Sequence, residues 1–187
     1  MTAISLEAPH DVAAREALLD LCMGPDRKLK SSERLRAGRR PSDGLAFSAH
    51  GPDGRLAGTV RLWDVETGDG RAALLLGPLA VHPWFRARGL GGDLMRAALA
   101  AAEALGHGVV ILVGDAPYYA RFGFSAARTS ALEMPGYFAR ERLLARELAP
   151  GALDGAHGLI RPSGVLLPAA ADPAASDLAV ARLRAIA

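Results

Sequence analysis

A turn rich in arginine and glycine holds the residues with the clearest capacity to bind a ligand. It comprises Arg86, Ala87, Arg88, Gly89, Leu90, Gly91 and Gly92, and it joins an apolar run to a helical pattern. The first backbone N–H groups of a helix are unpaired and lie at the positive end of its dipole, so they attract anions. Glycine lets the backbone approach a ligand closely, and arginine offers forked donors that suit phosphate. The turn therefore predicts an anion site.

Two common phosphate motifs do not fit this turn. The dinucleotide pattern G-x-G-x-x-G requires a glycine at position 94, which is Leu94, and the nucleoside-triphosphate loop requires a Gly-Lys-Ser/Thr ending that is absent. A tight strand-to-helix turn with surface arginines is the simpler interpretation if the turn is taken alone. A second segment changes that balance, because Tyr118-Tyr119-Ala120-Arg121-Phe122-Gly123-Phe124 follows at a later strand end.

Together the two segments resemble the GNAT superfamily of N-acetyltransferases. Arg86, Gly89 and Gly91 match in order the family pattern Q/R-x-x-G-x-G/A, and the preceding residues 79–83 resemble its fourth strand. Residues 118–124 resemble its second signature, an aromatic short helix that ends in Gly-Phe/Tyr. The resemblance covers residues 1–167 in element order and is strongest from 74 to 124.

The resemblance implies an α+β (α/β layered) fold, with a mixed, mostly antiparallel central sheet, splayed fourth and fifth strands, and helices on both faces. Acetyl-CoA is the implied cosubstrate and no metal is implied. Its pyrophosphate is expected on the backbone amides of residues 88–92, and its pantetheine arm alongside Leu79, Ala80 and Val81. The interruption at Gly77-Pro78 agrees with a bulged strand, since proline removes a ladder donor.

The family usually transfers the acetyl group directly, so a cysteine nucleophile is unnecessary and Cys22 is expected to be a small core residue. The departing thiolate needs a proton, and the resemblance implies Tyr119, four residues before Gly123, as the donor. Tyr118 is the competing candidate. A backbone N–H within residues 79–81 is the expected oxyanion donor.

The general base stays open. Many relatives carry a glutamate on the fourth strand, but residues 71–81 contain no carboxylate. Asp115 fits a helix cap better than a base, because it lies two residues before Pro117. The remaining candidates are Asp64, Glu66, His82 and a water chain.

An alternation of strand and helix patterns must position these residues. The predicted elements are a strand at 3–8, a helix capped by Asp11 and stopped by Gly24-Pro25, a hairpin of 45–49 and 56–65, a strand at 72–81, a helix at 90–105, a buried strand at 109–113 and a short helix over 118–122. Residues 26–43 suggest a second, short helix with a solvated basic face. Residues 140–148 fit a helix or a strand, 158–167 a last strand, and Asp172-Pro173 the start of a terminal helix.

Composition narrows the class of protein. The 187 residues carry a net charge of +2, with two lysines and twenty arginines nearly balanced by acids, and the chain has one cysteine. We expect no disulfide, no cysteine-based zinc site, no signal peptide or membrane span, no nucleic-acid partner and a cytoplasmic location. We also expect one N-acetyltransferase domain at 1–167 and a helical, alanine-rich appendage at 168–187.

The leading hypothesis is an acetyl-CoA-dependent N-acetyltransferase that acts on a primary amine of a small molecule. A peptide or protein amine is an alternative acceptor, a non-catalytic acyl-CoA-binding module is an alternative function, and a homodimer is a candidate assembly. The acceptor pocket is expected between the first two helices, the third strand's exit and the loop at 134–140. Arginines at 34–40 and 140–146 favour an anionic acceptor, whereas carboxylates in the same segments favour a cationic one.

Overall fold

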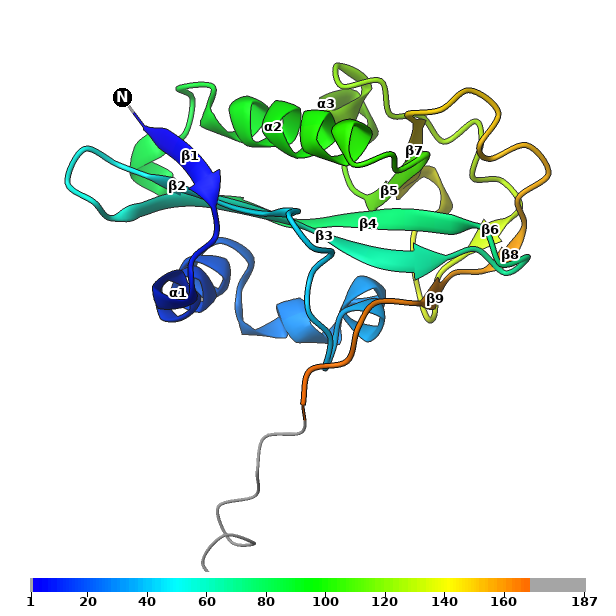
Figure 1. Ribbon diagram of the computed structural model, residues 1–187, viewed down its shortest axis with the longest axis horizontal. Coiled ribbons are helices and arrows are strands. Elements are labelled where there is room, and N and C mark those ends of the chain that lie inside the picture. The colour runs from blue at the N-terminus through cyan, green and yellow to red at the C-terminus, as the bar shows by residue number, and fades with distance from the viewer. Residues whose placement is uncertain (1, 169–187) are drawn as a thin grey trace, which may run out of the picture.

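A seven-stranded sheet forms the centre of the computed structural model, which describes residues 2–168 (Figure 1). The strand order is β1-β2-β3-β4-β5-β7, with β9 beside β3. Neighbouring strands are antiparallel except β4 and β5, which are parallel. The strands are β1 Ala3–Leu6, β2 Ala46–His50, β3 Leu56–Glu66, β4 Ala72–Val81, β5 Val109–Val113, β7 Leu143–Glu147 and β9 Arg161–Pro162. The predicted mixed, mostly antiparallel sheet is confirmed.

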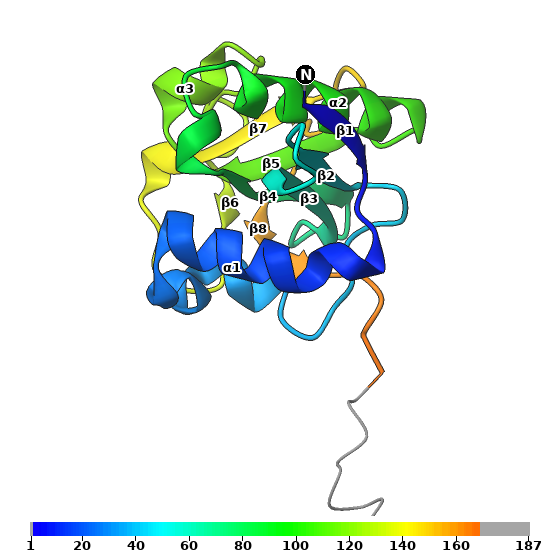
Figure 2. The same ribbon diagram turned by 90° about the vertical axis from the view of Figure 1, so that its left-hand side faces the viewer.

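Helices cover both faces of this sheet (Figures 1 and 2). On one face lie α2 (Leu90–Ala104) and α3 (Ala116–Ala120), and on the other lie α1 (Val12–Met23) and the 3₁₀ turns η2 (Pro25–Leu29) and η3 (Ser31–Leu35). The shorter elements are η1 Pro9–Asp11, η4 Pro83–Phe85, η5 Arg140–Arg142 and the parallel pair β6 Leu132–Glu133 and β8 Gly158–Leu159. None of the helices within residues 2–168 is long and apolar enough to cross a membrane.

Strand β5 shows why an unbroken apolar run predicts a central strand. Val110 and Leu112 belong to the core beneath α2, whereas Val109 and Ile111 belong to the core on the opposite face. Because both faces of the strand are covered, every side chain of β5 faces apolar surroundings and the strand has no polar alternation.

The β4–β5 pair opens after two residues, as the predicted splay requires. The parallel register holds Leu74 opposite Val110 and Leu75 opposite Ile111, and β4 then continues to Val81 without a further partner on β5. The register with β3 shifts opposite Gly77-Pro78, and Gly77 has φ of +124°, which favours glycine. The Trp63 indole N–H donates to the Gly77 carbonyl at 2.6 Å.

Some expected elements differ from the structure. The predicted helix in residues 26–43 is replaced by the two 3₁₀ turns η2 and η3, and its arginines are not uniformly solvated, since Arg27 and Arg36 are buried. Asp11 precedes α1, but its carboxylate accepts from Ala8 N at 3.0 Å instead of capping the helix.

The C-terminal expectations also changed. Residues 140–148 hold η5 and the strand β7. The single strand expected at 158–167 is divided into β8 and β9, which pair with different strands. The helix expected after Asp172 lies outside the described residues, as does all of the predicted appendage except Pro168.

Candidate active site

The glycine turn forms a cleft at the N-terminus of α2. Gly89 occupies the N-cap position with φ of +82°, and Ala87 also has a positive φ of +59°. The cleft has a volume of about 370 Å³. It is lined by Val81, Phe85, Arg86, Ala87, Gly89, Leu90, Gly91, Gly92, Arg96, Tyr118, Arg121 and Phe122. Most of the residues expected to bind the cofactor therefore converge here.

The two arginines of the turn point in different directions. Arg86 lines the cleft and donates from Nε to the Val81 carbonyl at 3.3 Å. Arg88 lies over the Phe85 ring, 6.0 Å from its centroid, and lines a neighbouring groove on the α1 side. Ala80 also faces α1, where it packs with Leu18 and Leu19.

Two further arginines line the cleft that the sequence reasoning did not single out. Arg96 lies one helical turn after Gly92 and pairs with Asp93 at 2.6 Å. Arg121 lies over the Tyr118 ring at 4.3 Å. Spacing was the available signal, because Arg96 lies four residues after Gly92 and Arg121 three residues after Tyr118, and residues three or four apart on a helix share a face.

A second cavity, of about 120 Å³, occupies the opening between β4 and β5. It is lined by Met23, Arg27, Lys30, Ser32, Glu33, Arg36, Leu76, Gly77, Pro78, Leu79, Leu112, Val113 and Tyr119. The bulge of β4 thus forms one wall, and the turns η2 and η3 form the opposite wall.

The two tyrosines of α3 line two different cavities. Tyr119 lines the β4–β5 cavity, whereas the Tyr118 hydroxyl lies 3.1 Å from the position of a Cβ on Gly91, at the cleft. The rings meet edge to face with centroids 4.9 Å apart. Burial raises the pKa of Tyr119 to about 12, with Arg142 acting in the opposite direction, so its phenol is protonated at neutral pH.

The carboxylates proposed from sequence lie elsewhere. Asp115 accepts from Tyr118 N at 3.2 Å and is an N-cap, as its position before Pro117 predicts. The other base candidates are also absent from the lining of the β4–β5 cavity. Asp64 and Glu66 lie along β3 beside β9, and His82, which is not a carboxylate, accepts from Trp84 N at 3.3 Å. Glu33 of η3 is the carboxylate that lines the cavity within residues 2–168, and the sequence analysis did not select it.

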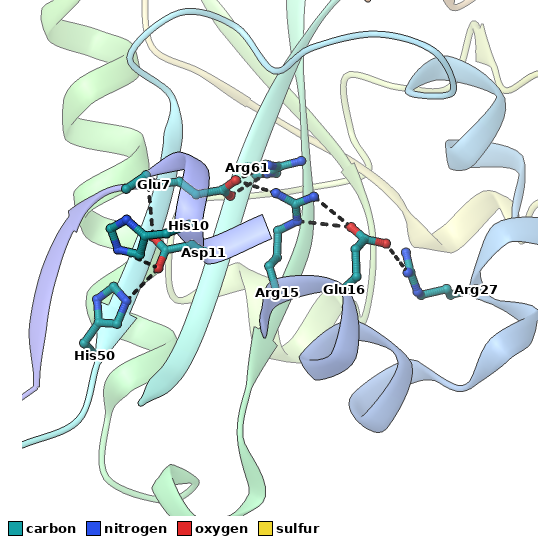
Figure 3. Close-up of polar contacts among 9 residues, drawn as sticks. Glu7, His10, Asp11, Arg15, Glu16, Arg27, His50 and Arg61 are labelled. Carbon is teal, nitrogen blue, oxygen red and sulfur yellow. Dashed lines mark hydrogen bonds and ion pairs between the residues drawn. The ribbon is translucent and has the colours of Figure 1, made fainter. Parts of the chain in front are cut away.

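An ion-pair network fixes the wall that faces β4 (Figure 3). Glu7 accepts from Arg15 of α1 and from Arg61 of β3, and Arg15 also pairs with Glu16 at 2.9 Å. Glu16 in turn accepts from Arg27 of η2 at 2.5 Å. Because Arg27 and Arg15 are almost fully buried, this chain of contacts ties η2 to the sheet.

A third, more open cavity of about 530 Å³ adjoins the same wall. It lies between the η2–η3 segment and the loop at 136–142, which is close to the acceptor region expected from sequence. Its lining includes Asp26, Leu29, Lys30, Ser31, Ser32, Arg34, Val113, Gly136, Tyr137, Phe138, Ala139 and Arg142. Within residues 2–168, no group of three His, Cys, Asp or Glu side chains is arranged to hold a metal ion.

Comparison with known proteins shows what the central part of the chain resembles. A family model described as an acetyltransferase (GNAT) domain matches residues 44–126, which include the glycine turn and both tyrosines. This segment matches the GNAT acetyltransferase domain, and the chain as a whole is similar to N-acetyltransferases of the GNAT superfamily. The GNAT fold expected from the resemblance is confirmed.

Similar proteins extend over most of the chain. YhbS of Escherichia coli K12, named as an uncharacterized N-acetyltransferase, is 29% identical over 161 residues, which cover 84% of this chain and 93% of YhbS. The crystal structure of E. coli YhbS in complex with CoA is 28% identical with a TM-score of 0.74, covering 86% of this chain and 89% of that one. A GNAT acetyltransferase from Brucella melitensis in complex with acetyl-CoA is 25% identical with a TM-score of 0.55, covering 92% and 99%.

Proposed function

We propose that this GNAT protein transfers the acetyl group of acetyl-CoA directly to a primary amine of a small molecule. The observation that carries the proposal is the placement of two cavities along one unpaired edge of β4. Val81 lines the cleft at the glycine turn, and Leu79, two residues earlier, lines the cavity that contains Tyr119. Residues two apart on a strand share a side, so one extended ligand can follow β4 from one cavity to the other.

Acetyl-CoA has the shape and charge for this path, and the relatives above are bound to CoA or acetyl-CoA. We place its pyrophosphate at the backbone amides of residues 88–92, where α2 begins, with Arg86, Arg96 and Arg121 near the phosphates. The pantetheine arm would run beside Leu79 and Val81. Ala80 would contribute its backbone, since its side chain packs under α1.

Tyr119 is the proposed hydrogen-bond donor to the departing sulfur. Its raised pKa keeps the phenol protonated, which is the form that donates. A pKa of about 12 also makes full proton transfer to a thiolate less favourable than transfer from a free phenol. We therefore assign Tyr119 to stabilisation of the thiolate through a hydrogen bond, and Tyr118 to the cleft.

Glu33 is the proposed proton acceptor for the amine. It lines the cavity with Tyr119, on the wall opposite β4, and pairs with Arg36 at 3.0 Å. A carboxylate on that wall can accept a proton from an amine that approaches from the open 530 Å³ cavity. That volume lies within the usual range for small-molecule sites, which supports a small acceptor over a protein acceptor.

One assay tests the proposal. Thiol release from acetyl-CoA is measured across a panel of small amines and short peptides, while acetyl-CoA binding is measured by calorimetry. Turnover of a small amine supports the proposal, and turnover of peptides alone would favour the protein-acceptor alternative. Acetyl-CoA binding without turnover on any acceptor favours the non-catalytic module, and no binding rejects both. The homodimer, the cytoplasmic location and the single domain at 1–167 stay predictions.

A further inference from the structure

Arg36 is a buried cation whose hydrogen-bonding capacity is only partly used. The residue is 9% exposed, and its Nε has no hydrogen-bond partner among the described residues. Nη2 donates to Glu33 at 3.0 Å and, at a longer 3.4 Å, to Ser32. Burial lowers the pKa of Arg36, and Glu33 only partly opposes that effect. An unpaired buried donor on a charged group is unfavourable, so a site for an anion beside Arg36 would relieve it.

Arg36 lies beside the β4–β5 cavity, where we place the acetyl transfer. Its Nη1 lies 3.7 Å from where a Cβ on Gly77 would be, so the guanidinium faces the β4 bulge. Arg36 lines the cavity that also contains Tyr119. An anion bound there would belong to the acceptor, because the cofactor phosphates are assigned to the separate cleft at the glycine turn.

Neighbouring side chains make this region electropositive. The linings of the 120 Å³ cavity between β4 and β5 and of the adjoining 530 Å³ cavity together contain five cationic side chains and two carboxylates. Within residues 2–168, three of the cations have no ion-pair partner: Lys30, Arg34 and Arg142. Such a field attracts an anion and disfavours a polycation.

The same field helps the chemistry. Transfer requires a neutral amine, and nearby positive charge disfavours the ammonium form. An acceptor with an anionic group could bind to the cations through that group and present its amine to Glu33. A polyamine would bring a second positive charge into the same cavity.

We propose that the acceptor is an amine that also carries a carboxylate or phosphate group, and that Arg36 binds this group with help from Lys30 and Arg142. This inference rests on the proposed function, since it names the substrate class of that site.

The experiment compares acceptors that share an amine but differ in charge. The carboxylate arm pairs glycine with glycinamide and β-alanine with its amide, the phosphate arm pairs phosphoethanolamine with ethanolamine, and putrescine represents the cations. We expect kcat/KM to be at least about tenfold higher for the anionic member of one arm, as loss of a charged hydrogen bond predicts. The arm that responds identifies the anion. Equal or higher values for neutral or cationic amines would overturn the inference while leaving the acetyltransferase function intact.

Protein variants test whether Arg36 causes the preference. Arg36→Gln should remove it, because KM for the anionic acceptor should rise about 10- to 100-fold more than KM for its neutral partner. Arg40→Gln is the matched control, because Arg40 is exposed, pairs with Asp43 and lies outside both cavities. A preference that survives in folded Arg36→Gln contradicts the assignment. Lys30→Gln, at an exposed position, gives the second test if Arg36→Gln does not fold, with an expected rise in KM of a few fold.

A binding measurement covers the case of no turnover. Inorganic phosphate and N-acetylglycine are titrated into the CoA-bound protein and into its Arg36→Gln variant. Binding that depends on Arg36 supports the inference, and absence of binding to the wild type overturns it. Failure of the protein to bind CoA would instead reject the proposed function, and the inference would fall with it.

Discussion

Gly114 leaves the space that the Tyr119 ring occupies. A Cβ at residue 114 would lie 2.7 Å from Cδ2 of Tyr119 and closer still to Cε2, and 2.9 Å from the Leu112 side chain. The end of β5 therefore determines where the phenol lies in the β4–β5 cavity. This contact joins a backbone requirement to the proposed position of the hydrogen-bond donor.

Gly114→Ala should therefore displace the Tyr119 ring. We expect kcat to fall about 10- to 100-fold, because small displacements of a catalytic group are costly, and unfolding free energy to fall by about 1–3 kcal/mol from overpacking. Steady-state kinetics and urea unfolding measure the two effects. Gly164→Ala is the control, since its Cβ would meet neighbours only at 3.5 Å or more. Unchanged kcat in Gly114→Ala would remove Tyr119 from the mechanism.

The anion site can be tested by charge alone at Gly89. This residue is the N-cap of α2 with positive φ, and asparagine and aspartate both tolerate that conformation and both cap helices. Gly89→Asp should weaken acetyl-CoA binding by at least about tenfold relative to Gly89→Asn, because the carboxylate repels phosphate. Calorimetric titration with acetyl-CoA measures both variants. Equal affinities would show that no phosphate binds beside Gly89.

Burial of the Tyr119 phenol should also make the stability of the protein depend on pH in the alkaline range. The pKa of Tyr119 is about 12 in the folded protein and near 10 when unfolded, so the neutral form is favoured by folding. The stabilisation from this buried neutral phenol is therefore present below pH 10 and is lost as pH rises toward 12. The unfolding free energy of wild type should fall relative to Tyr119→Phe by roughly 2–3 kcal/mol over that interval. Parallel pH dependences in urea unfolding would mean that the phenol is not buried.

Sequence patterns predicted the elements whose periodicity comes from burial. The helix after Gly89 and the strand at 109–113 appear where expected, because their apolar positions pack on the sheet or lie within it. The aromatic segment also lies at the opening of β4 and β5. The sequence left Tyr119 and Tyr118 both as candidates for the proton donor, whereas in the structure Tyr119 lines the β4–β5 cavity and Tyr118 lines the cleft at the glycine turn.

The wall of the β4–β5 cavity that η2 and η3 form could not be predicted in the same way. A basic segment is usually a solvated face, but Arg27 is buried and donates hydrogen bonds to Glu16 and Asp20, which lie 11 and 7 residues away in the chain. Such pairing depends on the bend at Gly24-Pro25, which places η2 beside α1. Glu33 and Arg36 were missed for the same reason, since no spacing rule for 3₁₀ turns identifies the side that faces β4.

Glu16 links this wall to α1, and its removal should weaken the fold at neutral pH. Burial alone would raise the pKa of Glu16, but hydrogen bonds from Arg27 and Arg15 outweigh it and lower the pKa below the ordinary 4.5. The stabilisation is therefore present above pH 4.5 and is lost as pH falls through the folded value.

Glu16→Gln should lower the unfolding free energy at pH 7 by up to about 1 kcal/mol, a modest value because the Glu16 side chain is 40% exposed. The difference from wild type should shrink as pH falls below 4.5, since the wild-type carboxylate then becomes protonated and neutral like the amide. Urea unfolding at several pH values measures this. Asp43→Asn is the control, because its pair with Arg40 is 3.5 Å long and Asp43 is 84% exposed. A difference that persists unchanged at low pH would show that Glu16 acts through packing instead of charge.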